Sequence, residues 1–138
     1  MPTLSDFAMR LWVIRREIDD RRGGLRGEFR GTATFRPDGD GLRYDEVGKL
    51  RMGDGPVLNA QRDYLWRPEG EGIAVLFADG RPFHRFVPSG RAPGTDHPCG
   101  RDLYRVTYDF TAWPCWGTEW IVTGPAKDYA MATRYERA

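Results

Sequence analysis

The chain has 138 residues, of which 30% are charged, and its formal net charge is +1. This length is typical of one domain, and 21 basic against 20 acidic residues leave no basic excess of the kind that nucleic-acid binding requires. No apolar run approaches the roughly 20 residues of a membrane span, and the first residues lack a signal-peptide pattern. We therefore expect a single cytoplasmic domain, residues 1–138, that binds neither nucleic acid nor membrane.

Turn-forming residues divide the chain into short segments rich in aromatic and β-branched side chains. The 17 glycines and 10 prolines recur at about the spacing of one strand plus one turn, a pattern typical of an all-β sandwich or barrel. A helical turn is predicted over Leu4–Met9, with Thr3 or Ser5 as its N-cap. Strands are then predicted over residues 11–19, 26–36, 42–51, 57–67, 72–79, 83–88, 102–110, 116–123 and 127–136.

Several of these segments alternate between apolar and polar residues, as strands with one buried face do. In 102–110 the aromatic residues share one face, and in 116–123 Trp116 and Trp120 do the same. Consecutive strands joined by short turns form an up-and-down meander most simply, and closure removes the exposed edges. We predict a closed or nearly closed antiparallel barrel, lipocalin-like, of about 8–10 strands.

The segment 102–123 also bears on the two cysteines. If Phe110 faces Trp116 in a hairpin, Tyr104 faces Val122, and Cys99 and Cys115 then lie at opposite ends of the ladder. That separation is about 12 residues or about 40 Å, whereas a disulfide needs Cα atoms within about 7 Å. The register therefore predicts two free thiols.

Both ends of the chain resemble bacterial lipocalin-like proteins. Residues 120–134, with a Gly-Pro turn, an Asp-Tyr pair and a later Arg, resemble their closing hairpin, and residues 7–12 resemble their opening strand. The resemblance implies that Trp12 plugs the barrel base under a cation–π contact from Arg134. The chain departs from the family's Gly-x-Trp pattern, because Arg10 precedes Leu11 and Trp12 here.

A second resemblance spans nearly the whole length. The segments 18–21, 79–84, 97–104 and 124–129 are similar to a family of small bacterial proteins known only as a domain of unknown function. This resemblance implies a fold but no activity. A calycin-type barrel would enclose a cavity for a small apolar molecule.

The two histidines are the first candidates for chemistry. Asp79-Gly80 predicts a type I′ hairpin turn, which leaves His84 unexplained. His84 is the best catalytic candidate if it points into the barrel, but period-two alternation alone does not decide its direction. His84, His97 and Cys99 are weak candidates for metal ligands without an evident fourth, so we expect no metal and no cofactor.

Charges on otherwise apolar faces are the second signal. Arg62 and Glu46 either form an internal ion pair or offer a polar anchor for a ligand. The leading hypothesis is a barrel that binds a small apolar or aromatic molecule, with a homodimer left open. The alternatives are an enzyme in the same cavity with His84 as acid or base, and a barrel used only for protein interaction. The expected ligand contacts are Arg62, Tyr64, His84 and Tyr104, with Trp66 and Trp120 as walls.

Overall fold

A computed structural model describes residues 2–8 and 10–138 of the chain. It contains a short helix, α1 (Leu4–Phe7), and eleven strands. The strands are β1 (Leu11–Asp20), β2 (Leu25–Asp38), β3 (Gly41–Met52), β4 (Leu58–Glu69), β5 (Gly72–Phe77), β6 (Pro82–Phe86), β7 (Arg91–Pro93), β8 (His97–Cys99), β9 (Asp102–Asp109), β10 (Trp116–Thr123) and β11 (Asp128–Arg137).

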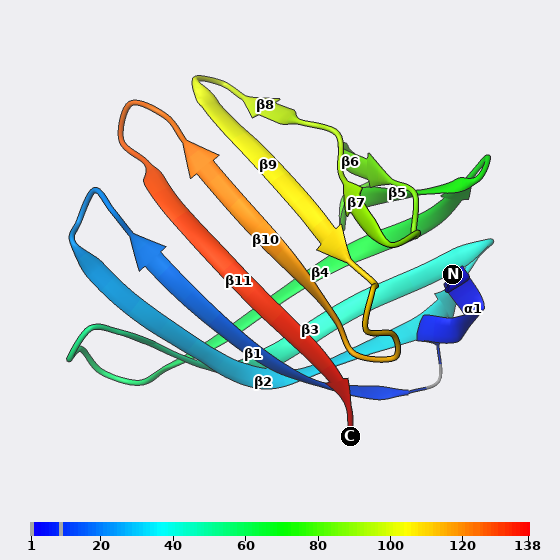
Figure 1. The fold of residues 1–138 in the computed structure, drawn as a ribbon, viewed down its shortest axis with the longest axis horizontal. Helices are drawn as coiled ribbons and strands as arrows, with labels where there is room; N and C mark the ends of the chain where they lie inside the picture. The colour runs from blue at the N-terminus through cyan, green and yellow to red at the C-terminus, as the bar shows by residue number, and fades with distance from the viewer. Residues whose placement is uncertain (1, 9) are drawn as a thin grey trace.

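The strands form one antiparallel sheet that curls on itself (Figure 1). Its order is β6-β5-β4-β3-β2-β1-β11-β10-β9-β7, and β8 also pairs with β9. Most neighbours in the sequence are therefore neighbours in the sheet. The exceptions are β11, which returns to pair with β1, and β7, which pairs with β9 instead of β6 or β8. The sheet joins the first and last long strands at its centre.

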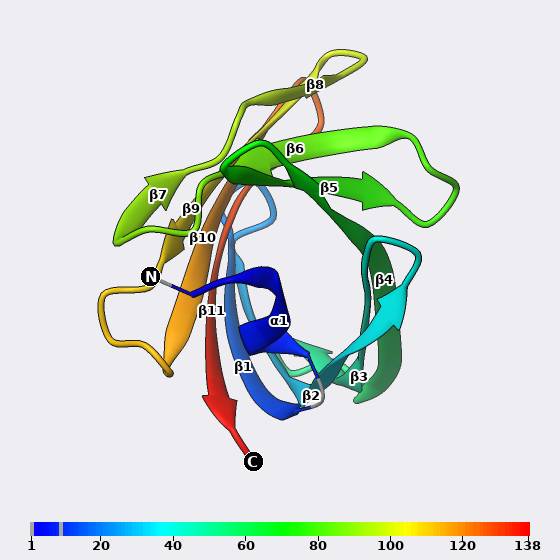
Figure 2. The ribbon, with the colours of Figure 1, turned by 90° about the vertical axis from the view of Figure 1, so that its right-hand side faces the viewer.

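The two edges of the sheet meet through a connecting segment rather than through a ladder. The backbone nitrogen of Thr95 donates to the oxygen of Arg85 in β6 at 2.8 Å, and that of Gly94 donates to the oxygen of Val106 in β9 at 2.9 Å. Residues 94 and 95 thus connect β6 to β9 and nearly close the barrel. Seen from one end, the strands surround α1, which lies across the opening (Figure 2).

The predicted fold class is confirmed, and each of the nine predicted strands is present within a few residues. The two strands that the sequence did not predict, β7 and β8, have three residues each and contain proline. Such short segments carry no measurable alternation, so period-two patterning cannot find them. The predicted helical turn is present as α1, while Met9 lies outside the described residues.

The predicted register of the β9–β10 hairpin is confirmed. Tyr104 faces Val122, and Tyr108 faces Thr118. Both cysteines are free: Cys99 ends β8 beside the start of β9, and Cys115 precedes β10 at the other end of the same ladder.

A cluster of aromatic rings fills the end of the barrel that α1 covers. Phe7 of α1 and Trp12 of β1 are fully buried, and the indole Nε1 of Trp12 donates to the backbone oxygen of Phe7 at 3.2 Å. The rings within 6.4 Å of Phe7 are Trp12, Phe35, Trp66, Phe110, Trp113 and Trp116. We call this cluster the base.

Arg134 does not contact Trp12, which corrects the expected cation–π pair. On β11 the buried positions are Met131, Thr133 and Tyr135, so Arg134 faces outward and is exposed. Tyr135 takes the place inside the barrel, stacked on Trp116 with ring centroids 3.8 Å apart. Adjacent residues of a strand face opposite sides, and this parity alone separates Arg134 from Trp12.

The β5–β6 hairpin corrects two further details. The backbone nitrogen of Gly80 donates to the oxygen of Phe77 at 2.8 Å, so the turn runs over 77–80 and is not a two-residue type I′ turn. A register shift between Val75 and Leu76 then leaves both Phe83 and His84 buried, although adjacent residues were expected on opposite faces.

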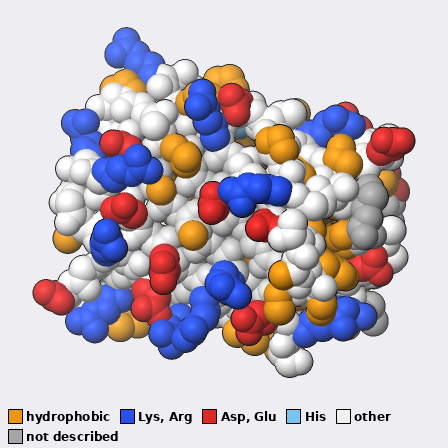
Figure 3. Space-filling model, in the orientation of Figure 1, with side chains coloured by type: hydrophobic (Ala, Val, Ile, Leu, Met, Phe, Trp, Pro, Cys, Tyr) orange, Lys and Arg blue, Asp and Glu red, His pale blue; other side chains and the backbone are white. Residues whose placement is uncertain are grey.

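The outer surface carries interspersed charges of both signs on the face shown in Figure 3. Exposed cross-strand ion pairs such as Arg36–Asp45, at 2.8 Å, account for part of this pattern. No helix among the described residues is long and apolar enough to span a membrane.

Candidate functional site

A cavity of about 730 Å³ lies at the end of the barrel away from the base. The strands that pass the base also reach this end: β9 contributes Tyr104 here and Tyr108 deeper in the interior. The cavity, which we call the mouth cavity, is lined by Gln61, Arg62, Tyr64, Phe77, Arg81, Pro82, Phe83, His97, Pro98, Cys99, Tyr104, Trp120, Tyr129 and Met131.

Stacked aromatic rings form one wall of the mouth cavity. Phe83 lies 4.5 Å from Phe77 and 5.2 Å from Trp120, nearly parallel to both. Tyr64 lies 5.6 Å from Phe83, and Tyr104 lies 6.0 Å away. Phe83 is at the centre of this wall because the register shift in the β5–β6 hairpin turns it inward. The wall offers flat apolar surface to a ligand.

Ion pairs flank the rim of the mouth. Lys127 lies 3.1 Å from Asp102 and donates to the hydroxyl of Tyr104 at 3.1 Å. These two hydrogen bonds raise the pKa of Lys127 above its usual value. Arg81 binds Asp79 of the same turn at 2.7 Å. The rim charges are therefore largely paired with each other.

A buried ion pair lies deeper in the barrel. Arg16 of β1 donates from Nη1 and Nη2 to the two oxygens of Glu46 of β3, at 2.7 and 2.9 Å. Its Nε donates to Thr133 at 2.8 Å, and the hydroxyl of Tyr44 donates to Glu46 at 2.5 Å. Tyr44 in turn shares a hydrogen bond of 2.8 Å with the hydroxyl of Tyr135.

The electrostatics of this network favour an ionised pair. Burial raises the pKa of Glu46, but the hydrogen bonds and charge of Arg16 outweigh it and hold this pKa below 4.5. Burial also lowers the pKa of Arg16, and Glu46 more than reverses that effect. The pKa of Tyr135 rises to about 12, first because of its burial and then because of the carboxylate of Glu46. The tyrosines therefore stay neutral hydrogen-bonding groups.

His84 points into the barrel and is buried. Its Nε2 lies 2.6 Å from the hydroxyl of Tyr108. Burial, with a smaller contribution from His97, lowers the pKa of His84 to about 3, so the imidazole is neutral at pH 7. Its Nδ1 has no hydrogen-bond partner among the described residues, and neither have Trp116 Nε1 and Thr118 Oγ1.

These three atoms belong to residues that line a second, smaller cavity of about 30 Å³. This inner cavity lies between the base and the mouth cavity, and its lining includes the Arg16–Glu46 pair. Its volume is enough for one water-sized group. Arg62, Tyr64 and Trp120 line both cavities and so form the boundary between them.

The six predicted ligand contacts fall into two groups. Arg62, Tyr64, Tyr104 and Trp120 line the mouth cavity, whereas Trp66 and His84 line only the inner one. The weak metal candidates His97 and Cys99 are at the mouth, away from the inner cavity that His84 lines. Among residues 2–8 and 10–138, no group of three or more His, Cys, Asp or Glu side chains could hold a metal ion.

Arg16, the main partner of Glu46, was not among the residues predicted from the sequence. A signal was present, because Trp12 and Ile14 are apolar at alternate positions of β1 and place Arg16 on the same inward face. The aromatic residues Phe77 and Phe83 were also missed as cavity walls. Phe77 alternates with the buried Ile73 and Val75, so alternation along β5 could have found it. The inward direction of Phe83 depends on the register shift, which leaves no mark in the hydrophobic pattern.

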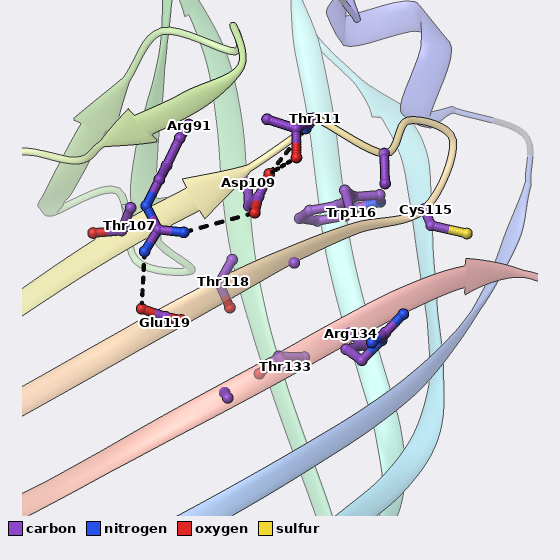
Figure 4. Close-up of a pocket in the computed structure, with 13 residues that line it drawn as sticks. Arg91, Thr107, Asp109, Thr111, Cys115, Trp116, Thr118, Glu119, Thr133 and Arg134 are labelled. Atoms are coloured by element: carbon purple, nitrogen blue, oxygen red, sulfur yellow. Dashed lines mark hydrogen bonds and ion pairs between the residues drawn. The ribbon is translucent and has the colours of Figure 1, made fainter.

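A further depression of about 340 Å³ lies on the outside of β9, β10 and β11 (Figure 4). Arg91 of β7 reaches over it, between Asp109 at 3.7 Å and Glu119 at 3.2 Å. Thr111 donates to the same Asp109 carboxylate. Because these exposed charges satisfy one another, the depression offers less to a ligand than the mouth cavity does.

Fold and site together define a nearly closed antiparallel barrel with an aromatic cavity at one end. Residues 10–137 match a protein-family model described as "Family of unknown function (DUF6314)", and the chain belongs to this family. No curated protein matches the sequence.

Two solved structures share the fold. The S-type phycobiliprotein lyase CPES from Guillardia theta superposes with a TM-score of 0.63 at 10% sequence identity, covering 96% of this chain and 89% of the lyase. A protein of unknown function from the DUF3598 family of Nostoc punctiforme gives a TM-score of 0.66 at 9% identity. This chain is covered in full there, but spans only 50% of that protein. At such low identities the likeness establishes the fold alone.

Proposed function

We propose that this lipocalin-like barrel binds a small, flat, aromatic or conjugated molecule in its mouth cavity. The observation that carries the proposal is the stacked wall of Phe77, Phe83 and Trp120 in a cavity of about 730 Å³. Small-molecule sites commonly have about 300–1,000 Å³ and an apolar lining with a few polar groups. Arg62, Tyr64 and Tyr104 supply the polar groups here.

The solved neighbours share the fold and do not identify the ligand. One of them is named a phycobiliprotein lyase, which makes a bilin-type molecule one candidate for this chain. Bilins are conjugated and elongated, and they match the chemistry of the aromatic wall. The cytoplasmic location and the homodimer stay predictions from the sequence.

The proposal can be tested with N-phenyl-1-naphthylamine, an uncharged aromatic probe whose fluorescence rises in apolar surroundings. We expect saturable binding with a single site per chain. Trp120→Ala removes one stacked ring and should weaken binding by roughly tenfold. A bilin such as biliverdin should displace the probe.

Ile121→Ala is the matched control, because Ile121 follows Trp120 in β10 but is exposed on the outside. It should leave the affinity for the probe unchanged. Absence of saturable binding, or equal effects of Trp120→Ala and Ile121→Ala, would contradict binding in the mouth cavity.

An enzyme with His84 as acid or base has less support. With a pKa lowered to about 3, His84 is neutral at pH 7, so it lacks the imidazolium proton of a general acid and is a weak base. The group within hydrogen-bonding distance of its Nε2 is the hydroxyl of Tyr108, a contact that fits a structural role. The ligand-binding function is therefore the better supported of the two.

A further inference from the structure

We infer that the ligand of the mouth cavity carries an anionic group, such as a carboxylate, and that Arg62 binds it. This inference rests on the proposed function and adds the charge of the ligand to it. The charges of the lining, the hydrogen bonds of Glu46 and the position of Arg62 on the cavity floor carry the argument.

The lining of the mouth cavity is positively charged. Its described residues include Arg62 and Arg81 but no Asp or Glu. Arg81 is exposed on the rim and is bound to Asp79 at 2.7 Å. Arg62 is therefore the cationic group of the lining whose charge remains available to a ligand.

Glu46 does not use up the charge of Arg62. Its two carboxylate oxygens already accept two hydrogen bonds from Arg16 and one from Tyr44. Arg62 Nε lies 3.6 Å from the nearer oxygen, beyond hydrogen-bonding distance. The interior thus holds two arginines against one carboxylate.

The position of Arg62 suits it to recognise a ligand. It faces Glu46 directly in the β3–β4 ladder and lines both cavities, and its side chain is 38% exposed. Tyr64 follows it on the same face of β4, below the aromatic wall. A guanidinium in this place can direct several donors to one carboxylate while the rest of the ligand lies against the aromatic wall.

An excess cation inside a barrel weakens the fold unless something compensates for it. An anionic ligand would supply that compensation. Without the ligand, the guanidinium of Arg62 is solvated by water, because its side chain is partly exposed. The ligand chemistry that fits is therefore a conjugated or aromatic body with one acidic group. Neutral aromatic molecules should bind more weakly.

Two probes of the same skeleton test this inference. 1-Anilinonaphthalene-8-sulfonate is N-phenyl-1-naphthylamine with an added sulfonate, so the pair differs by one negative charge. We expect the wild-type chain to prefer the sulfonate by roughly 10- to 100-fold, as a charge-assisted hydrogen bond provides. Arg62→Met should abolish this preference and leave the affinity for the neutral probe within about threefold of wild type.

Arg51→Met is the control, since Arg51 is exposed on the outside of β3. Arg81→Met tests the other arginine of the lining, which is bound to Asp79 on the rim. Both should retain the preference. If Arg62→Met does not fold, Arg62→Gln and Arg62→Lys replace it, and only the lysine variant should retain part of the preference.

The outcomes separate the two proposals. Equal binding of both probes by the wild-type chain, or a preference that persists without Arg62, overturns the inference while binding in the cavity stands. If Arg81→Met loses the preference for the sulfonate, the anionic group binds at the rim, and the inference about Arg62 is also overturned. If neither probe binds, the proposed function fails, and the inference fails with it.

Discussion

Arg16 and Glu46 meet inside the barrel although their strands are not neighbours. The strand between them, β2, presents Gly31 and Ala33 on its inner face, which leaves room for the long side chain of Arg16. The guanidinium also lies 5.0 Å from the ring of Phe29, which adds a cation–π contact. These small residues are thus part of what permits a buried charge network here.

Arg16→Met should destabilise the fold by about 3 kcal/mol, because it leaves the Glu46 carboxylate buried without its main partner. Arg62 lies close enough to limit the loss, so we do not expect complete unfolding. Chemical denaturation measures the free energy of unfolding. The double variant Arg16→Met with Glu46→Leu should recover most of the loss, since both charges are then removed.

The control for that prediction is Arg36→Met, which breaks an exposed pair with Asp45. An exposed pair contributes less than about 1 kcal/mol. Similar losses in Arg16→Met and Arg36→Met would show that the buried pair contributes no more than a surface one.

His84 predicts a pH dependence of stability. Its pKa is lowered from 6.5 to about 3 in the folded chain, so below pH 6.5 the unfolded chain binds a proton that the folded chain does not. The contribution of neutral His84 to the unfolding free energy is therefore fully present above pH 6.5. It is lost progressively as the pH drops from 6.5 toward 3. Between pH 7 and 5.5 this single group should remove about 1 kcal/mol of unfolding free energy.

The comparison variant is His84→Gln, which cannot take up the proton. It should be less stable at pH 7 but lack the wild-type loss between pH 7 and 5.5. Thermal or denaturant unfolding at several pH values measures both slopes. Parallel pH profiles of the two proteins would contradict the buried, neutral state of His84.

Contacts between residues of adjacent strands in one ladder could be predicted from the sequence. An Arg62–Glu46 ion pair was one of two interpretations of these residues, the other being a polar anchor for a ligand. The structure places the two residues opposite each other with 3.6 Å between Arg62 Nε and the carboxylate, although the short contacts of Glu46 go to Arg16. Contacts across the barrel depend on which intervening side chains are small. Alternation along a single strand carries no information of that kind.

At the scale of elements, the long strands could be predicted because each has one buried face. The pattern failed where the chain leaves this regularity, at β7, at β8 and at the register shift that turns Phe83 inward. Phe83 and the residues of β8 line the mouth cavity. Residues 94 and 95, between β7 and β8, join β6 to β9, and we call this junction the seam. The part of the candidate site that could not be predicted is therefore the part built from these irregular segments.

The helix α1 has four residues and is too short to be stable alone. Thr3 and Asp6 cap its start, and Phe7 anchors it in the aromatic base. Phe7→Ala should therefore destabilise the protein by about 3–5 kcal/mol through the cavity left among the rings. Urea denaturation followed by tryptophan fluorescence measures this loss.

Ser5→Ala, on the same helix, is the control for Phe7→Ala. Ser5 is exposed, and its replacement should change the unfolding free energy by less than about 0.5 kcal/mol. If Phe7→Ala is tolerated equally well, α1 does not serve as the plug of the base.

At the scale of the whole molecule, stability should be distributed unevenly around the barrel. Strands β1, β2 and β11 lie at the centre of the sheet, and each is paired on both sides. The seam between β6 and β9 relies instead on a few hydrogen bonds of residues 94 and 95. Local opening should begin where the fewest backbone hydrogen bonds hold the structure together.

Hydrogen exchange of the backbone amides tests this distribution. The amide of Arg85 donates to the hydroxyl oxygen of Thr95 at 3.0 Å, so Thr95→Val removes the acceptor and should speed exchange at Arg85 by roughly five- to tenfold. Amides of β1 should exchange slowest and stay unchanged in that variant. Thr32→Val, in the centre of β2, serves as control and should leave Arg85 unaffected. Equal protection at Arg85 and in β1 would mean that the seam is as stable against local opening as the paired strands. The mouth cavity beside it would then have no locally unstable edge through which a ligand could enter.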